Sequence, residues 1–332
     1  MLRTPICDLL GIDYPIVLAG MGGVSMHRLV AAVSNAGGLG VLGAATLDAE
    51  GLRAEIRKVR ELTDRPFAVD LLAPIPDMIR PQMKVIFDEG VKVFVAGLAV
   101  PQEFIAEMHE RGMIVIVMTG KVQHAVKAEQ AGADIVAAQG TEAGGHTGEV
   151  GTMALVPQTV DAVRIPVLAA GGIADGRGLV AALALGAQGV IMGTRFIATP
   201  EAQADPRYRE AILRSGESDT IRTRCYTGKP ARAIRNPYNQ EWERRASEIL
   251  PFPAQAAFSM QQGVMDYMGV GRGTDPERTF MPAGQGMGLI REIKPAAEIV
   301  RDVIREAEET LDRLAKLRGG ARPAAQSTAA SS

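Results

Sequence analysis

Eight short apolar segments recur along the first 200 residues, and this repeat constrains the fold more than any other feature. They cover residues 15–20, 39–44, 66–72, 91–97, 113–120, 133–140, 165–172 and 187–193. A continuous apolar run is typical of a strand buried on both faces, as in a parallel sheet. Segments with helical periodicity lie between the runs. Most of them end in a glycine, the residue favoured after a helix C-terminus: Gly37, Gly90, Gly112, Gly132 and Gly186.

Eight strand–helix units favour an α/β fold of the (β/α)₈ TIM-barrel type, and a doubly wound sheet of eight strands is the alternative. We assign residues 1–199 and 281–318 to the barrel. Residues 200–280 are more polar and contain the single tryptophan, which predicts a mainly helical insertion or lid. Residues 319–332 have little to bury and are expected to form a disordered tail.

Composition narrows the function classes. The net charge of −2 gives no reason to expect nucleic acid or an anionic membrane as partner, and we expect a small-molecule substrate instead. No apolar run approaches the length of a membrane span. Cys7 and Cys225 form no disulfide or metal framework, and the N-terminus lacks a signal-peptide core. A cytoplasmic location is the expectation, and a homodimer is left open.

Glycine-rich loops follow the expected strands, where barrel proteins place their sites. Gly171 and Gly172, together with the helix start at 175–178, predict a phosphate cradle, because glycine lets backbone N–H groups approach an oxyanion. Gly193 and Thr194 end the eighth strand. The alternative is that these glycines only form tight turns. Their occurrence after both the seventh and the eighth strand favours the phosphate site.

One histidine stands out in the loop "GTEAGGHTGE", after the sixth strand. His146 lies in a segment too rich in glycine to be a helix or a strand, and the alternative role is a loop residue held by backbone. His27 and His109 occupy helical positions typical of surface or packing residues, and His124 lies near a helix start. The sequence contains no HExxH, GxSxG, Cys–His pair or paired carboxylates, so we expect no metal. A cofactor is therefore expected to supply the reactivity.

Six motifs carry a family resemblance. They are "AAVSNAGGLGVLGA", "QGTEAGGHTG", "TMALVPQ", "AAGGIADGRGLVAALALGAQGVIMGTRF", "TGKPARAIRN" and "PAGQGMGLI". Between about Pro15 and Ile290 the chain resembles the nitronate monooxygenase (2-nitropropane dioxygenase-like) family. The same superfamily includes FMN-dependent enoyl-ACP reductase II and NADH:quinone reductases. The motifs are more specific for the superfamily than for the reaction.

The resemblance implies a barrel with a helical insertion that holds non-covalent FMN. Backbone groups at Gly171, Gly172, Gly193 and Thr194 would then bind the phosphate. Residues of the first loop would lie along the flavin ring: Ala19, Gly20, Met21 and Gly22. Three residues would line the ribityl and ring side: Gln139, Gly144 and Gly145. His146 corresponds to the catalytic residue of the family, and Gln285 to the residue of an "AGQ" motif that closes the site.

Two positions depart from the family pattern. The third strand often ends in "GVN", whose asparagine contacts the flavin, whereas this chain has Asp70. A carboxylate there would disfavour an anionic reduced flavin unless it is protonated or paired. The first loop, "AGMGGVS", lies between the reductase and nitronate types and is nearer the nitronate type. Both departures concern the substrate more than the cofactor.

Three functions follow from these observations. The first is an FMN-dependent nitronate monooxygenase, which oxidises alkyl nitronates with O₂ to carbonyl compounds and nitrite, with His146 as base or cation. The second is an NAD(P)H-dependent reductase of an enoyl thioester (enoyl-ACP or enoyl-CoA) or a quinone. For it, Lys229, Arg232 and Arg235 would either meet substrate phosphates or form a solvated face. The third, a flavin-binding barrel without catalysis, is disfavoured by His146.

Overall fold

The computed structural model describes residues 2–73, 76–265 and 273–319. Its centre is a closed barrel of parallel strands. The eight strands are β1 (Ile16–Leu18), β2 (Gly40–Gly43), β3 (Phe67–Leu72), β4 (Val93–Gly97), β5 (Ile114–Thr119), β6 (Ile135–Gln139), β8 (Val167–Ala170) and β9 (Gly189–Met192). Their order is β1-β9-β8-β6-β5-β4-β3-β2, and a parallel bridge between Val17 and Leu39 joins the two ends. The predicted (β/α)₈ barrel is confirmed, because a doubly wound sheet would leave two open edges.

The two faces of each strand explain the continuous apolar runs. In β3, Ala68 belongs to an inner cluster that fills the barrel, whereas Val69 and Leu71 belong to the cluster between the strands and the helices. Both faces are therefore buried, and no polar face is left to interrupt the run. Helix α1 (Pro5–Leu10) buries Ile6 and Leu10 in the inner cluster.

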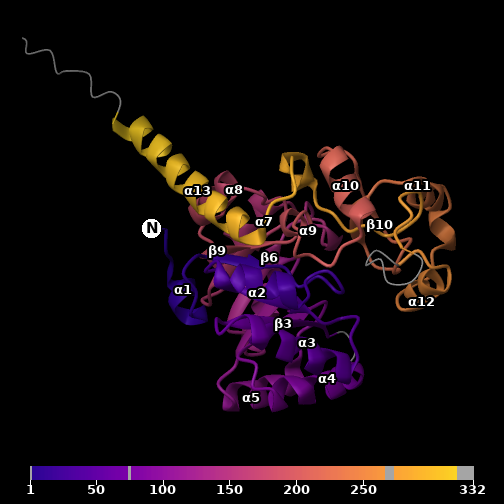
Figure 1. The fold of residues 1–332 in the computed structure, drawn as a ribbon, viewed down its shortest axis with the longest axis horizontal. Helices are drawn as coiled ribbons and strands as arrows, with labels where there is room; N and C mark the ends of the chain where they lie inside the picture. The colour runs from indigo at the N-terminus through magenta and orange to yellow at the C-terminus, as the bar shows by residue number, and fades with distance from the viewer. Residues whose placement is uncertain (1, 74–75, 266–272, 320–332) are drawn as a thin grey trace, which may run out of the picture.

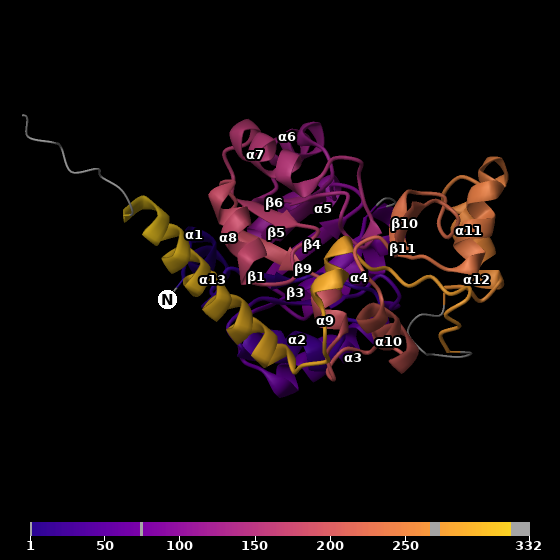
Figure 2. The ribbon, with the colours of Figure 1, turned by 90° about the horizontal axis from the view of Figure 1, so that it is seen from above.

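Helices cover the outside of the barrel. They are α2 (His27–Asn35), α3 (Ala49–Leu62), α4 (Pro76–Asp88), α5 (Gln102–Glu110), α6 (Val122–Gln130), α7 (Thr152–Ala162), α8 (Gly176–Ala184) and the short α9 (Thr194–Ile197). Seen from above, α6 to α8 lie on one side of the strands and α2 and α3 on the other (Figure 2). Helix α13 (Ala296–Gly319) packs against α8 and α2 and extends beyond the barrel.

The insertion projects from the other side of the barrel (Figure 1, orange). Its helices are α10 (Pro206–Arg214), α11 (Pro237–Arg244) and α12 (Ala254–Gln261), with a 3₁₀ turn η1 (Ala246–Glu248), in line with the predicted helical character. It also contains an antiparallel pair that the sequence did not predict, β10 (Thr220–Thr223) and β11 (Ala231–Ile234). The two-residue strand β7 (Gly145–His146) joins this pair from the barrel side, so the prediction that this glycine-rich loop contains no strand is wrong at these two residues. A small aromatic core, which includes Tyr226 and Phe280, supports the insertion.

The chain returns to the barrel through the 3₁₀ turn η2 (Gln285–Leu289) and ends in α13. Gly319, where the predicted tail begins, is the last residue of α13, and the remainder of that tail, 320–332, lies outside the described residues. In the described ranges, no helix combines the length and the apolar character that crossing a membrane requires.

Candidate active site at the carboxyl ends of the strands

A cavity of about 380 Å³ lies where the barrel strands end. All but one of the predicted site residues line it: Ala19, Gly20, Met21, Gly22, Asp70, Gln139, Gly144, Gly145, His146, Gly171, Gly172, Gly193 and Thr194. Apolar side chains from the insertion complete the lining, among them Phe252, Met260 and Phe280. Residues far apart in sequence thus meet in one cavity of the size usual for small-molecule sites.

The turns after β8 and β9 offer unoccupied backbone donors. Within the described residues, no hydrogen bond occupies the N–H groups of Gly172, Ile173 and Thr194. All three residues line the cavity. The Thr194 hydroxyl accepts a hydrogen bond from Gly284 N (2.9 Å), which fixes the returning chain beside this turn. Free N–H groups that face one cavity are suited to bind an anion such as a phosphate.

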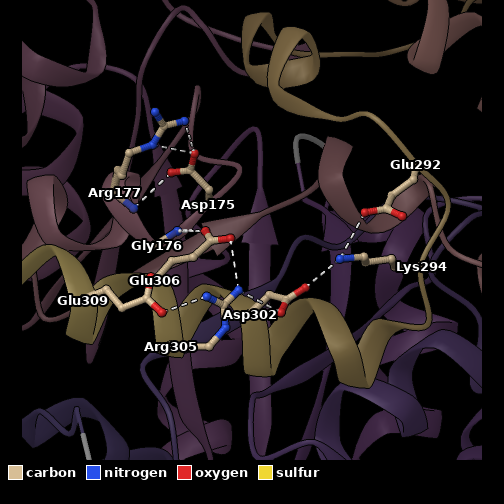
Figure 3. Close-up of polar contacts among 9 residues, drawn as sticks. All are labelled: Asp175, Gly176, Arg177, Glu292, Lys294, Asp302, Arg305, Glu306 and Glu309. Atoms are coloured by element: carbon tan, nitrogen blue, oxygen red, sulfur yellow. Dashed lines mark hydrogen bonds and ion pairs between the residues drawn. The ribbon is translucent and has the colours of Figure 1, made fainter.

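The start of α8 does not take part in this cradle, and this part of the prediction is wrong. The Asp175 carboxylate accepts hydrogen bonds from the N–H groups of Arg177 and Gly178, and Glu306 of α13 accepts one from Gly176 (3.1 Å) (Figure 3). The chain's own carboxylates therefore cap the helix, so its first N–H groups are not available to a ligand.

Two glycines shape the loop that carries His146. A Cβ atom on Gly144 would lie 2.8–2.9 Å from the backbone of Ala283, so this glycine allows the returning chain to pack closely. Gly145 has φ +73°, a left-handed conformation that favours glycine. The side chain of Gln139 donates to the His146 carbonyl oxygen (2.9 Å), and β7 pairs with β11 on the other side. The loop is held from the barrel and from the insertion.

The imidazole of His146 contacts the insertion. Its Nε2 lies 2.9 Å from the hydroxyl oxygen of Thr227, which the loop between β10 and β11 supplies. Burial and, to a smaller degree, the nearby ammonium of Lys229 together lower the pKa of His146 to about 4. The Lys229 ammonium itself lies over the ring of Phe252, 4.7 Å from its centre. His146 is therefore unprotonated at neutral pH, which suits a base.

Asp70 lies on β3, three strands away from β6 in the order of the barrel. Because side chains alternate along a strand, Asp70 points to the same face of β3 as Ala68, which is the inside of the barrel. Only 6 % of Asp70 is exposed. Burial raises the pKa of this carboxyl group to about 8. Asp70 packs so closely on Gly20 that a Cβ atom on that glycine would overlap the Asp70 side chain.

Other predicted residues lie elsewhere. Gln285 does not line this cavity but a neighbouring one, and its backbone N–H donates to the backbone carbonyl oxygen of Glu142 (2.9 Å). His27 contacts Glu55 (2.7 Å between Nδ1 and Oε2) and His109 contacts Asp134 (3.1 Å between Nε2 and Oδ2), as expected of packing residues. His124 is exposed and outside the cavity lining.

Two roles are predicted for the basic segment 229–235, to meet substrate phosphates or to form a solvated face, and neither role holds for Arg232. Arg232 is buried, and its guanidinium donates to the Thr141 carbonyl oxygen (2.8 Å) and the Thr220 hydroxyl (2.9 Å). It joins the insertion to the loop that carries His146. Arg232 is thus neither solvated nor free to bind a substrate phosphate.

Thr227 is the site residue that the sequence reasoning missed. It belongs to the motif "TGKPARAIRN", but a threonine in a turn carries no chemical pattern of its own. Only the fold shows that its hydroxyl meets the imidazole, across 81 positions of sequence.

A closed (β/α)₈ barrel with a small-molecule cavity at the carboxyl ends of its strands places this chain in the class of TIM-barrel proteins. The family model for nitronate monooxygenase matches residues 3–306, and the chain belongs to this family. It is an oxidoreductase, and the family is flavin-dependent in general.

Individual relatives differ in their named activities. A probable nitronate monooxygenase of Staphylococcus saprophyticus is 36 % identical, over 94 % of this chain and 99 % of its own length. The (3aS,4S,5R,7aS)-5-hydroxy-7a-methyl-1-oxo-octahydro-1H-indene-4-carboxyl-CoA dehydrogenase of Mycobacterium tuberculosis is 44 % identical, over 73 % of this chain and 69 % of its own length. Among solved structures, FabK from Thermotoga maritima has a TM-score of 0.87 and 40 % identity, with 96 % of this chain and all of that chain covered.

Proposed function

We propose that the protein is an FMN-dependent monooxygenase that oxidises alkyl nitronates with O₂ to carbonyl compounds and nitrite. The observation that carries the proposal is the position of His146, which shares one cavity with free backbone donors in a chain of the nitronate monooxygenase family. When bound, the flavin supplies the electron-accepting chemistry that no side chain of the cavity provides.

The residues present fit FMN. The free N–H groups of Gly172, Ile173 and Thr194 would hold the phosphate, with Gly171 and Gly193 giving the backbone access. The glycine-rich first loop would lie along the ring. Gln139, Gly144 and Gly145 would line the ribityl and ring side. Gln285, which lies beside the neighbouring cavity, would act only through the backbone that it shares with Gly284 and Gly286.

His146 would work first as a base. The lowered pKa keeps the imidazole unprotonated before the substrate binds, so it can take a proton from water. An anionic nitronate beside it would favour the protonated form, because an opposite charge stabilises the cation. The two roles considered for this residue, base and cation, would then be successive states of the same group.

The test is His146→Asn, with His124→Asn as the matched control. We expect His146→Asn to retain FMN and to lose turnover by about 10²- to 10⁴-fold, the range for a positioned acid–base group. His124 is exposed and outside the cavity, so its variant should match the wild type. Nitrite release and oxygen consumption report turnover, and the flavin absorbance reports binding. Near-normal turnover of His146→Asn would remove His146 from the mechanism.

A second candidate is an NAD(P)H-dependent reductase of an enoyl thioester or a quinone. It is favoured by the 44 % identity to a protein named as a carboxyl-CoA dehydrogenase. Anaerobic stopped-flow mixing of the FMN-loaded protein with NADH and with NADPH separates the two candidates. Fast bleaching of the flavin favours the reductase, and no response to either nucleotide favours the nitronate enzyme. A protein that cannot be loaded with FMN contradicts both.

A further inference from the structure

The ionisable side chains that line the cavity are few. Of the described lining residues, only Asp70, His146 and Tyr208 can titrate, and no lysine or arginine is among them. The Tyr208 hydroxyl donates to the carbonyl oxygen of Pro282. The charge of the cavity therefore depends on the protonation of Asp70 and His146.

The carboxyl group of Asp70 has no partner within the described residues: no side chain or backbone group hydrogen-bonds to its oxygens. The elements packed around it contribute Gly20 and Met21 of the first loop, Gly43 of β2 and Val95 of β4, none of which ionises. A buried carboxylate without a cation or a donor is costly, whereas the protonated form is not. The surroundings thus select the neutral acid.

Asp70 and His146 are shifted in opposite directions. Burial keeps the carboxyl group protonated and the imidazole unprotonated, so the cavity is uncharged at neutral pH. Two titratable groups whose pKa values are pushed apart divide the acid and base roles of a site between them. His146 then has the role of the base, and the protonated Asp70 has the role of the hydrogen-bond donor.

We propose that Asp70 serves the site as a protonated carboxyl group that donates a hydrogen bond to the bound flavin. This inference rests on the proposed function, because it requires FMN beside the first loop. Asp70 packs against Gly20 of that loop and lines the same cavity. A neutral donor favours negative charge that develops on its partner upon reduction, whereas an ionised carboxylate opposes it. Protonation of Asp70 would therefore raise the reduction potential of the flavin.

The test measures the midpoint potential of bound FMN in the wild type and in Asp70→Asn, at pH values below and above about 8. Asparagine keeps a donor but cannot ionise. Below this pH the two potentials should agree, and above it the wild-type potential should fall below that of the variant. A wild-type potential lower by a constant margin at every pH would show an ionised Asp70. Identical potentials throughout would show no contact with the flavin. Either result overturns the proposal.

A second measurement needs no flavin. The pKa of Asp70 in the folded chain, about 8, lies above its ordinary value of 3.8. The native state therefore keeps a proton that the unfolded state releases, and stability falls as pH rises between these values. Relative to Asp70→Asn, the wild-type apoprotein should lose stability across this window, measured by denaturant unfolding. Parallel curves overturn the protonated carboxyl group. If Asp70→Asn does not fold, Asp70→Ser replaces it in both measurements.

The two measurements separate this inference from the proposed function. A chain that binds no FMN contradicts the proposed function and the flavin contact, while the apoprotein curves still report the protonation of Asp70. A chain that turns over nitronate but shows identical potentials leaves the proposed function intact and removes only the role of Asp70.

Discussion

The cavity has two walls that are built differently. The barrel wall comprises the first loop (19–22), Asp70 and the turns after β8 and β9, and it is shaped mainly by backbone and glycine. The insertion wall comprises His146, Thr227 and the apolar side chains beside them. Repeated strand–helix units produce the barrel wall, whereas a contact across 81 residues produces the insertion wall. The barrel therefore supplies shape, and the insertion positions the imidazole of His146.

Of the three changes that compare the two walls, Gly20→Ala in the barrel wall is expected to have the largest effect. The added Cβ would overlap the Asp70 side chain, and overpacking of this kind typically costs about 1–3 kcal/mol of stability. We expect a lower unfolding temperature and loss of FMN binding in a flavin titration. Gly216→Ala is the control, because its Cβ would meet only a carboxylate oxygen of Asp219 at 3.6 Å. Normal FMN binding by Gly20→Ala would show that the barrel wall does not depend on this close packing.

A smaller effect is expected from Thr227→Val in the insertion wall. This change keeps the shape of the side chain and removes the hydroxyl that contacts His146. A typical hydrogen bond contributes about 0.5–1.5 kcal/mol, which corresponds to a loss of about two- to tenfold in kcat with FMN binding unchanged. Thr227→Ser keeps the hydroxyl and should retain activity. Equal losses in both variants would indicate that the methyl group, not the hydrogen bond, is what matters.

The smallest effect is a pH shift in Lys229→Gln. The ammonium lowers the pKa of His146, so its removal should raise that pKa, while burial still holds it below 6.5. In the wild type, kcat/KM for a nitronate should fall only as pH approaches about 4, and in the variant this fall should begin at higher pH. Arg235→Gln is the control, since Arg235 does not contribute to the shift. An acid limb that stays in place, or moves down, would contradict this account of His146.

The barrel wall could be predicted from sequence because its causes are local and repeated. Apolar runs buried on both faces, glycines after helices and glycine-rich loops at strand ends predict the strands and the mouth of the barrel. The start of α8 shows the limit of this reasoning. The segment "GGIADGRG" suits an anion site, but Asp175 caps the helix itself, and Glu306, 130 residues away, takes a further N–H group.

The insertion wall could be predicted only in part. His146 stands out because a glycine-rich loop has little structural need for an imidazole, yet its partner Thr227 has no distinguishing pattern. Strands β10 and β11 are only four residues long, which is too short for an alternating pattern to be recognised. Their arginines also make them resemble a polar loop more than a strand. The pKa shifts of Asp70 and His146 come from burial, which depends on the assembled cavity.

The pairing of β7 with β11 has a consequence for how such enzymes diversify. His146 belongs to the barrel in sequence but to the insertion sheet in hydrogen bonding. Mutations that shift β11 or the Thr227 loop are therefore expected to shift His146 as well. The 140–150 loop and the insertion thus form one hydrogen-bonded unit, and we expect a foreign insertion grafted onto this barrel to need a matching 140–150 loop.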